Sequence, residues 1–185
     1  PPVEVISREE FKQNSRQEYE NLTREDRLLH NIKYEALFMV GEDSSSVAVA
    51  RENLAGGVGG YYDPRAGEIK IVSNNLTTPK MNEITLSQEL FHALQDQQFN
   101  ISSFNQTTRE LHNARDGIIE GDGNYVDRLY QQQCTEGVWE GTCLMPQDQG
   151  APSDFQPHFG LYQIFLQPYS SGPAFVQDIH ESEGW

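Results

Sequence analysis

The sequence is poor in basic residues, and this restricts its partners. It contains 13 Lys and Arg against 28 Asp and Glu, which gives a formal net charge of −15 at pH 7. Nucleic acids and anionic membranes are bound by clustered Lys and Arg, which displace the counterions of phosphate groups. The chain also lacks an apolar run of about 18 residues, the length of a membrane-spanning helix. We therefore expect no nucleic-acid partner and no transmembrane segment in this chain.

Lysine is especially scarce, since only Lys12, Lys33, Lys70 and Lys80 occur. Few lysines, many carboxylates and a modest apolar content are typical of proteins that fold in concentrated salt. There, screening over a few ångströms removes the repulsion among the acids. An ordinary acidic protein from a low-salt organism is the alternative. We favour a halophilic origin.

Cysteine is also scarce, and Cys134 and Cys143 are the only two. Two cysteines alone cannot complete a structural zinc site. In an exported protein they would close a short loop as a disulfide, whereas in a cytosolic protein they would be two free thiols. We favour the disulfide, because other features of the sequence point to export.

Two features of the sequence are compatible with export, namely its glycosylation sequons and the start of the chain. The pattern Asn-x-Ser/Thr occurs more often than the composition predicts by chance, at Asn21, Asn75, Asn100 and Asn105. The chain begins Pro1-Pro2-Val3 without Met, as a trimmed or mature chain would. We expect an extracellular or cell-surface protein whose signal segment lies outside this sequence.

The first half of the chain predicts helices followed by a hairpin. Its 185 residues correspond to one domain, here 1–185, which we take to be a fragment of a longer chain. Ser7 and Thr23 each stand three residues before a carboxylate and predict helices over 8–21 and 24–39. The turn Asp63-Pro64-x-x-Gly67 between alternating flanks predicts a β-hairpin near 58–73.

The second half predicts further helices, so the fold class is α+β. Apolar spacing predicts helices over 85–99 and 108–133. The apolar residues expected to be buried on these two helices include Leu90, Ala93 and Leu94, then Leu111, Ile118 and Leu129. A last helix is predicted to start at Pro173, and residues 134–160 are predicted to be irregular.

The segment 85–98 carries residues that fit metal chemistry. Zinc proteases place two His at i and i+4 of a helix, and the Glu after the first His takes a proton from the metal-bound water. Here Glu89 and His92 match the Glu and the second His, and Gln88 occupies the first ligand position. Glu-x-x-His alone has little weight, because it often occurs by chance and a lone helical His is usually a surface or core residue.

A second segment, Glu120-Gly-Asp-Gly-Asn-Tyr125, follows on the next predicted helix. Together the two segments resemble the gluzincin zinc metallopeptidases, especially the compact archaeal and bacterial minigluzincins. In those, His-Glu-Leu-x-His-Ala-Leu-Gln-Asp-Gln is followed by Glu-Gly-[Asp/Glu]-Ala-x-Tyr-Val. The whole chain resembles an acidic haloarchaeal family of surface proteins with such a domain. The resemblance extends over roughly 8–185 and is sharpest at 85–98, 118–127 and 168–176.

The resemblance implies a zincin-like fold, in which the edge strand of a small sheet lies over an active-site helix. It implies that His92 is the second zinc ligand, Glu120 the third ligand and Glu89 the general base. It further suggests that Asn124, one turn past Glu120, orients a ligand, and that Tyr169 stabilises an oxyanion. Gly123 stands where the family has a small Ala, and we expect this change to have little effect.

Gln88 departs from the family pattern. A Gln carbonyl oxygen is neutral and binds zinc more weakly than an imidazole nitrogen. A site of Gln88, His92 and Glu120 would have one nitrogen ligand in place of two, so zinc binding should be weak or lost. One hypothesis is a pseudo-peptidase that keeps the fold and binds a peptide or protein in the cleft. The alternatives are an active zinc peptidase with a Gln ligand, an introduced substitution at Gln88, and a purely structural surface module. We favour the pseudo-peptidase.

Overall fold

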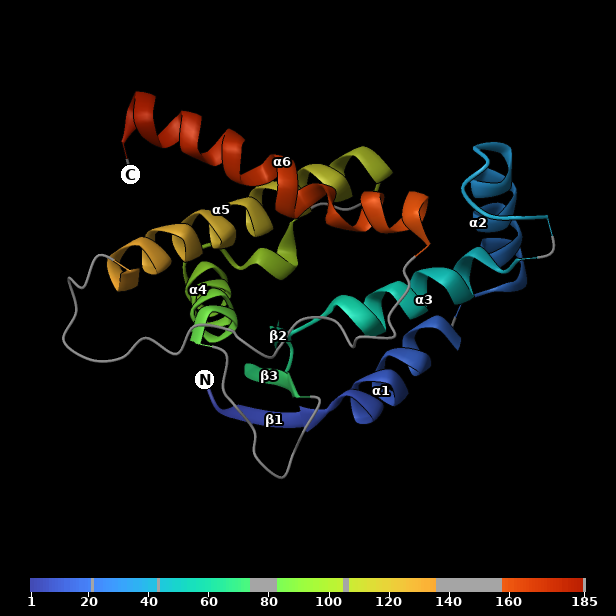
Figure 1. Cartoon of the computed structure of the whole chain (residues 1–185), viewed down its shortest axis with the longest axis horizontal. Helices are drawn as coiled ribbons and strands as arrows, with labels where there is room; N and C mark the ends of the chain where they lie inside the picture. The colour runs from blue at the N-terminus through green and yellow to red at the C-terminus, as the bar shows by residue number, and fades with distance from the viewer. Residues whose placement is uncertain (21, 43, 74–82, 105–106, 136–157, 185) are drawn as a thin grey trace.

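The computed structural model describes residues 1–20, 22–42, 44–73, 83–104, 107–135 and 158–184. Within these ranges the chain is α+β and mostly helical, with a small sheet (Figure 1). The elements in chain order are β1 (Val3–Ser7), α1 (Arg8–Glu20), α2 (Arg24–Ala36), α3 (Ser46–Gly57), β2 (Gly60–Asp63), β3 (Glu68–Ser73), α4 (Glu83–Phe99), α5 (Arg109–Thr135) and α6 (Phe159–Glu183). The predicted fold class is therefore confirmed at this level.

The sheet has the strand order β1-β3-β2. The predicted hairpin is confirmed: β2 and β3 pair antiparallel, with Tyr61 opposite Lys70. Its turn closes through the Gly67 N–H, which donates to the Asp63 carbonyl at 2.8 Å, and Gly67 has a φ of +66°. Strand β1 was not predicted, and it pairs parallel to β3 after a crossover that contains α1, α2 and α3. This order leaves β2 at the edge of the sheet.

The predicted helix starts near 8 and 24 are confirmed. The Ser7 hydroxyl accepts from the Glu10 N–H at 3.0 Å, and Thr23 and Asp26 form a reciprocal capping box at the start of α2. Helix α2 ends at Ala36, three residues before the predicted end. Helix α3 was not predicted, although Ser45 caps it by accepting from the Ala48 N–H.

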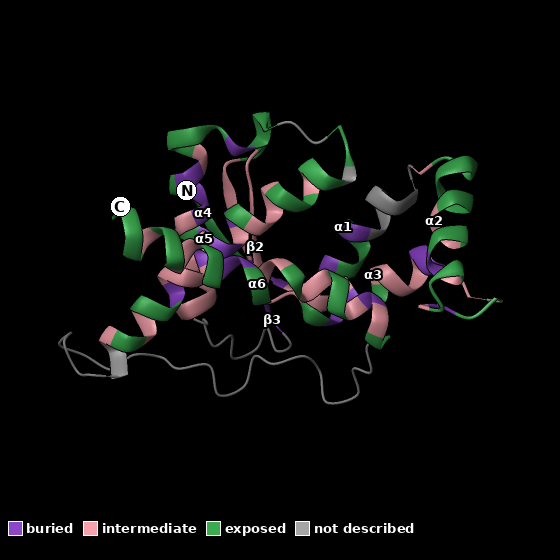
Figure 2. Cartoon of the chain, turned by 90° about the horizontal axis from the view of Figure 1, so that it is seen from above, coloured by how far each residue is buried: buried purple, intermediate pink, exposed green. Residues whose placement is uncertain are grey.

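Helices α4 and α5 lie where they were predicted, but their buried faces differ from the prediction. Ala93 is buried as expected, whereas Leu94 is 53% exposed and Ile118 is 51% exposed. The other leucines that were wrongly expected to be buried are Leu90, Leu111 and Leu129. The buried side chains of these helices are instead largely polar, and include Glu89, His92, Gln95 and Asp127. In Figure 2 the buried residues gather where α4 and α5 meet the strands.

Helices α5 and α6 cross closely, because two glycines bring them together. A Cβ at Gly121 would lie 2.5 Å from the backbone carbon of Gly172. Only backbones without side chains can approach this closely. Helix α6 begins at Phe159, so the predicted start at Pro173 is wrong; Pro168 and Pro173 lie inside the helix. Pro173 is buried at this crossing.

Several sequence predictions fall outside the described residues. The predicted irregular segment lies almost wholly within 136–157, which also contains Cys143, so the Cys134–Cys143 disulfide stays a prediction. Of the sequons, only Asn100 is described; it is exposed and adopts a left-handed conformation directly after α4. None of the helices in the described part of the chain is long and apolar enough to span a membrane.

Candidate functional site

A cleft of about 1000 Å³ runs along the edge strand β2. One wall is formed by α4, which contributes Gln88, Glu89 and His92. The facing wall is formed by α5 and α6, which contribute Glu120 and Tyr169. All five are residues that the sequence analysis proposed for the site. The fold therefore brings them to one cleft, although they come from three helices far apart in the sequence.

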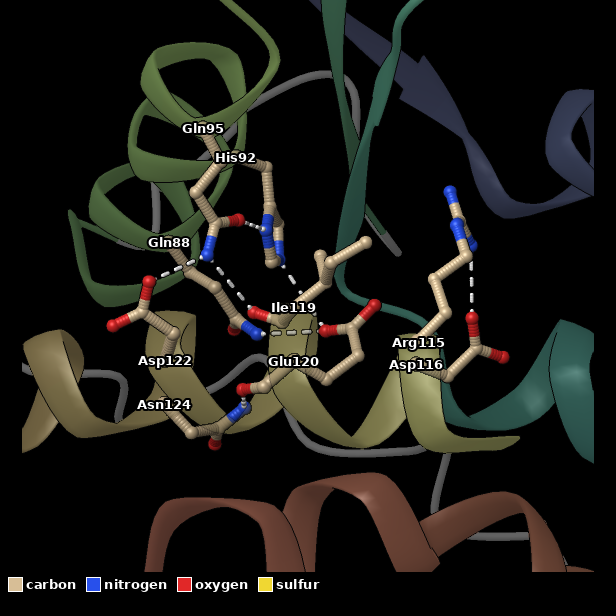
Figure 3. Close-up of polar contacts among 9 residues, drawn as sticks. All are labelled: Gln88, His92, Gln95, Arg115, Asp116, Ile119, Glu120, Asp122 and Asn124. Atoms are coloured by element: carbon tan, nitrogen blue, oxygen red, sulfur yellow. Dashed lines mark hydrogen bonds and ion pairs between the residues drawn. The ribbon is translucent and has the colours of Figure 1, made fainter. Parts of the chain in front are cut away.

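The centre of this cleft is the carboxylate of Glu120. Its Oε2 lies 3.3 Å from His92 Nε2 and accepts a hydrogen bond from the Gln88 amide nitrogen, also at 3.3 Å (Figure 3). Figure 3 shows Gln88 and His92 pointing from α4 toward Glu120 on α5. We call Gln88, His92 and Glu120 the polar triad. Gln88 and His92 each bond to Glu120.

Tyr169 extends this cluster from α6. Its hydroxyl donates a hydrogen bond to Glu120. Burial and the nearby charges of Glu120 and Glu89 raise the pKa of Tyr169 well above its ordinary value. The phenol is therefore neutral and acts as a donor. It lies in the cleft as the oxyanion hypothesis requires, but it donates to Glu120.

Glu89 is buried behind the polar triad, against the sheet. Its carboxylate accepts a hydrogen bond from the Tyr62 backbone N–H of β2. Burial raises the pKa of Glu89 to about 7, although the neighbouring His92 charge opposes the rise. Glu89 thus holds its proton more tightly than an ordinary glutamate. Helix α4 is thereby fixed to the edge strand through Glu89.

His92 is held in one orientation by Gln95, a residue that the sequence analysis missed. The Gln95 amide nitrogen donates to Asp122 Oδ2 at 2.8 Å and to the Ile119 carbonyl at 3.3 Å. Its carbonyl oxygen therefore faces His92 Nδ1, at 2.8 Å, and that nitrogen must carry a proton. His92 consequently presents Nε2 to Glu120. Gln95 lies three residues after His92 on α4, and that spacing is the only signal that could have found it.

The charge of Glu120 decides the protonation of His92. Burial alone would lower the pKa of His92, but the hydrogen bond and the negative charge of Glu120 raise it to about 9. At neutral pH the pair is therefore an imidazolium and a carboxylate.

A second buried carboxylate, Asp127, also lies outside the sequence predictions. The Ser87 hydroxyl donates to Asp127 Oδ1 at 2.6 Å, and this bond joins the start of α4 to α5. Burial raises the pKa of Asp127 to about 6.

Asn124, which the sequence analysis expected to orient a ligand, does not bond to the Glu120 carboxylate. Its amide donates to the Glu120 backbone carbonyl at 3.0 Å, within α5.

Gly123 matters more than the sequence predicted. A Cβ at this position would lie 2.8 Å from His92 Cε1 and 3.4 Å from Gln88 Cγ. The imidazole thus occupies the space that the methyl group of an Ala would fill. The expectation that Gly in place of Ala has little effect is wrong, because Gly123 allows His92 to pack directly against α5.

These residues do not fit a catalytic zinc ion. Such an ion takes three protein ligands, and within the described residues no group of three or more His, Cys, Asp and Glu side chains is arranged to hold a metal. A carboxylate only accepts hydrogen bonds, so Gln88 turns its amide nitrogen toward Glu120 rather than a ligand oxygen toward the cleft. His92 and Glu120 alone supply only two side chains of the kinds that commonly bind zinc.

Comparison of the chain with family models, with curated proteins and with solved structures found no match.

Proposed function

We propose that this chain is a gluzincin-like, zincin-fold domain without zinc catalysis, which binds an extended peptide or protein segment in its cleft. One observation carries the proposal: Gln88, His92 and Tyr169 all direct their polar groups to the carboxylate of Glu120. The positions of a catalytic metal site thus hold a closed hydrogen-bonded cluster. Such a cluster stabilises α4, α5 and α6 without a metal, and leaves the surrounding cleft for binding.

The edge strand supports binding of an extended ligand. The Val72 N–H donates to the Gly59 carbonyl, so Gly59, Tyr61 and Asp63 turn their backbone groups toward β3. Gly60 and Tyr62 therefore turn theirs away from β3, toward the cleft. The bond from the Tyr62 N–H to Glu89 agrees with this direction. Because Glu89 already accepts from the Tyr62 N–H, an extended peptide would pair with the other outward backbone groups of Gly60 and Tyr62, and pairing with an edge strand is a common mode of recognition.

The surface chemistry supports an extracellular setting. Concentrated salt would screen the net charge of −15, and the sequons would carry glycans on an exported protein. On this proposal the protein lies at the cell surface of a halophile, and its ligands are peptide segments met there. An exposed Asn100 is compatible with that placement.

The test is to bind a library of capped ten-residue peptides in concentrated salt, in parallel with and without a chelator. We expect a subset of peptides to bind, and mass spectrometry to recover them intact. Matched peptides that are N-methylated at alternate residues should bind more weakly, because they lack the donors that pair with an edge strand.

Two outcomes would contradict the proposal. Cleavage that both a chelator and the Glu89→Gln substitution abolish would show an active zinc peptidase. Absence of binding to every peptide would favour a structural surface module. Cleavage that persists in Glu89→Gln would indicate a contaminant, and the binding measurement would then be repeated on protein purified further.

A further inference from the structure

Helix α2 has an apolar face whose side chains are more than half exposed. Figure 1 shows α2 at one end of the molecule beside α3, and most of the helix is exposed in Figure 2. Leu28 and Leu29 are each 58% exposed, and Ile32 is 53% exposed. Ile32 follows the two leucines by four and three residues, so the three side chains share one face of the helix. Helix α2 contributes no residue to the cleft.

The opposite face of α2 is fixed to α3. The Ser46 N–H donates to Asn31 Oδ1 at 2.9 Å, and the Ser46 hydroxyl lies 2.6 Å from His30 Nδ1. Tyr34, on the same side of α2, is 5% exposed and belongs to a buried apolar cluster. One side of α2 therefore holds the helix in place, and its apolar face is left to a partner outside this chain.

The charge of α2 favours a second copy of the same chain as that partner. Copies of a chain with a net charge of −15 repel each other over most of their surface. Helix α2, in contrast, has no formal net charge. Its three basic and three acidic side chains are Arg24, Arg27, Lys33, Glu25, Asp26 and Glu35. Two copies can therefore meet along α2 without bringing net charge together.

The order of these charges fits an antiparallel pair of α2 helices. At about 100° per residue, Arg24 and Glu35 lie within about 20° of each other, along one edge of the apolar face. Asp26 and Lys33 likewise lie within about 20° of each other, along the other edge. Both pairs are centred between residues 29 and 30. A two-fold axis at this point places Arg24 opposite Glu35 of the second copy, and it places Asp26 opposite Lys33.

These charged side chains are available for pairing between copies. Among the described residues, Arg24 and Glu35 have no ionic partner within the chain. They also lie at the two ends of α2 where the helix dipole disfavours their charges, so a partner of opposite charge would stabilise each of them. Asp26 caps its own helix through Oδ2, which leaves Oδ1 for a second contact.

We propose that the protein forms a two-fold symmetric dimer through antiparallel pairing of α2, with Leu28, Leu29 and Ile32 at the centre of the interface. Burial of these apolar side chains supplies the affinity, and the two kinds of ion pair set the direction and the register. This inference is independent of the proposed peptide binding, because it uses no residue of the cleft.

Sedimentation equilibrium in concentrated salt, over a wide range of protein concentration, measures the association. We expect the mass at high concentration to be about twice that of one chain. Ile32→Glu should weaken the association at least about ten-fold, because it places a charge in the apolar centre. Leu94→Glu is the matched control and should associate like the wild type, because Leu94 is also 53% exposed but lies on α4. Circular dichroism shows whether each variant is folded.

Charge reversal tests the antiparallel register. Arg24→Glu and Glu35→Arg should each weaken the association, because each puts like charges opposite one another in the dimer. The variant with both substitutions restores opposite charges in these contacts and should regain the association of the wild type. These measurements use the lowest salt concentration in which the wild type is folded, since salt screens ion pairs.

A mass of one chain at every concentration would overturn the inference. Association that persists in Ile32→Glu, or that is lost equally in Leu94→Glu, would also overturn it, because the interface would then lie elsewhere. If the variant with both charge reversals associates no better than the single ones, the antiparallel pairing is wrong. None of these outcomes depends on peptide binding, so the proposed function stands or fails separately.

Discussion

At the scale of single residues, the carboxylate of Glu120 organises the site. It accepts from Gln88 of α4 and Tyr169 of α6, and it pairs with His92. Glu120 is partly buried, and a charge withdrawn from water is costly unless it is paired and hydrogen-bonded. Here its partners are neutral or cationic, so both conditions are met. Gln88 contributes to this pairing, because its amide nitrogen donates to the Glu120 carboxylate.

The pKa values of this cluster predict that stability falls as pH rises. From about pH 4.5 to about 7, the folded state keeps a proton on Glu89 that the unfolded chain releases. From about pH 6.5 to about 9, it likewise keeps the proton on His92. In both windows the folded state binds more protons, so the free energy of unfolding decreases toward high pH. The Glu89 window alone corresponds to a decrease of about 3 kcal/mol in the free energy of unfolding, because one pKa unit is equivalent to about 1.4 kcal/mol.

Urea unfolding at pH 5, 7 and 9 at constant salt measures this dependence. Glu89→Gln, which cannot titrate, should lose the larger part of the decrease between pH 5 and 7, because Asp127 contributes the rest, and should keep the decrease between pH 7 and 9. A wild-type midpoint that rises between pH 5 and 9 would contradict the assignment.

Gln95 should be important for stability although it does not line the cleft. Gln95→Leu leaves His92 Nδ1, Asp122 and the Ile119 carbonyl without their partner. An unsatisfied buried polar group costs about 1–3 kcal/mol, so we expect a loss of that size in urea unfolding. Gln98→Leu, on the exposed side of α4, is the control and should change stability by less than about 0.5 kcal/mol. Equal effects of the two substitutions would refute the role of Gln95.

At the scale of elements, the glycine contact between α5 and α6 sets the geometry of the site. It fixes how far Tyr169 on α6 lies from Glu120 on α5.

Gly121→Ala would place a methyl group 2.5 Å from Gly172, so the helices would have to separate. We expect a loss of about 2 kcal/mol or more. Gly117→Ala is the control: its Cβ would meet no atom within 4 Å, so helix propensity should stabilise that variant by up to about 1 kcal/mol. Thermal unfolding of the pair gives the comparison, and a neutral Gly121→Ala would disprove the tight crossing.

The elements also show how far the sequence could be interpreted. Local chemistry predicted the hairpin, because Asp63 and Gly67 define its turn, and it predicted α4 and α5. It could not predict which faces of these helices are buried. The usual rule buries leucine, whereas here polar residues such as His92 and Gln95 form the α4–α5 contact. The predicted start of α6 was too late, because proline is favourable at a helix start. In the structure Pro173 lies inside the helix, at the crossing with α5.

For the site, the resemblance to the gluzincin motifs suggested every residue of the polar triad, Glu89 and Tyr169. It missed Gln95 and Asp127, because their roles depend on how α4 packs on α5. It also misjudged Gly123, because only the packed structure shows the imidazole of His92 against this residue. Contacts between helices cannot be read from a single sequence.

At the scale of the whole molecule, the acidity predicts a dependence on salt. A net charge of −15 repels itself in dilute buffer, and screening at about 2 M KCl should reduce that repulsion to contact range. We expect the melting temperature to rise between these two conditions. The same measurement in sodium sulfate at equal ionic strength tests whether the rise in melting temperature also occurs in a second salt. A melting temperature that stays constant in KCl would contradict the halophilic origin.

The most direct test of the central claim is the zinc content of the wild type and of Gln88→His. Both proteins would be purified without a His tag, dialysed in concentrated salt with added zinc and then without it, and examined by elemental analysis. The account predicts a zinc content near zero in the wild type, because Gln88 and His92 each bond to Glu120. It predicts about one zinc per chain in Gln88→His, which completes the ligand set of the family that the sequence resembles. About one zinc per wild-type chain would contradict the loss of the metal site, and no zinc in Gln88→His would contradict the zincin-like arrangement of α4 and α5.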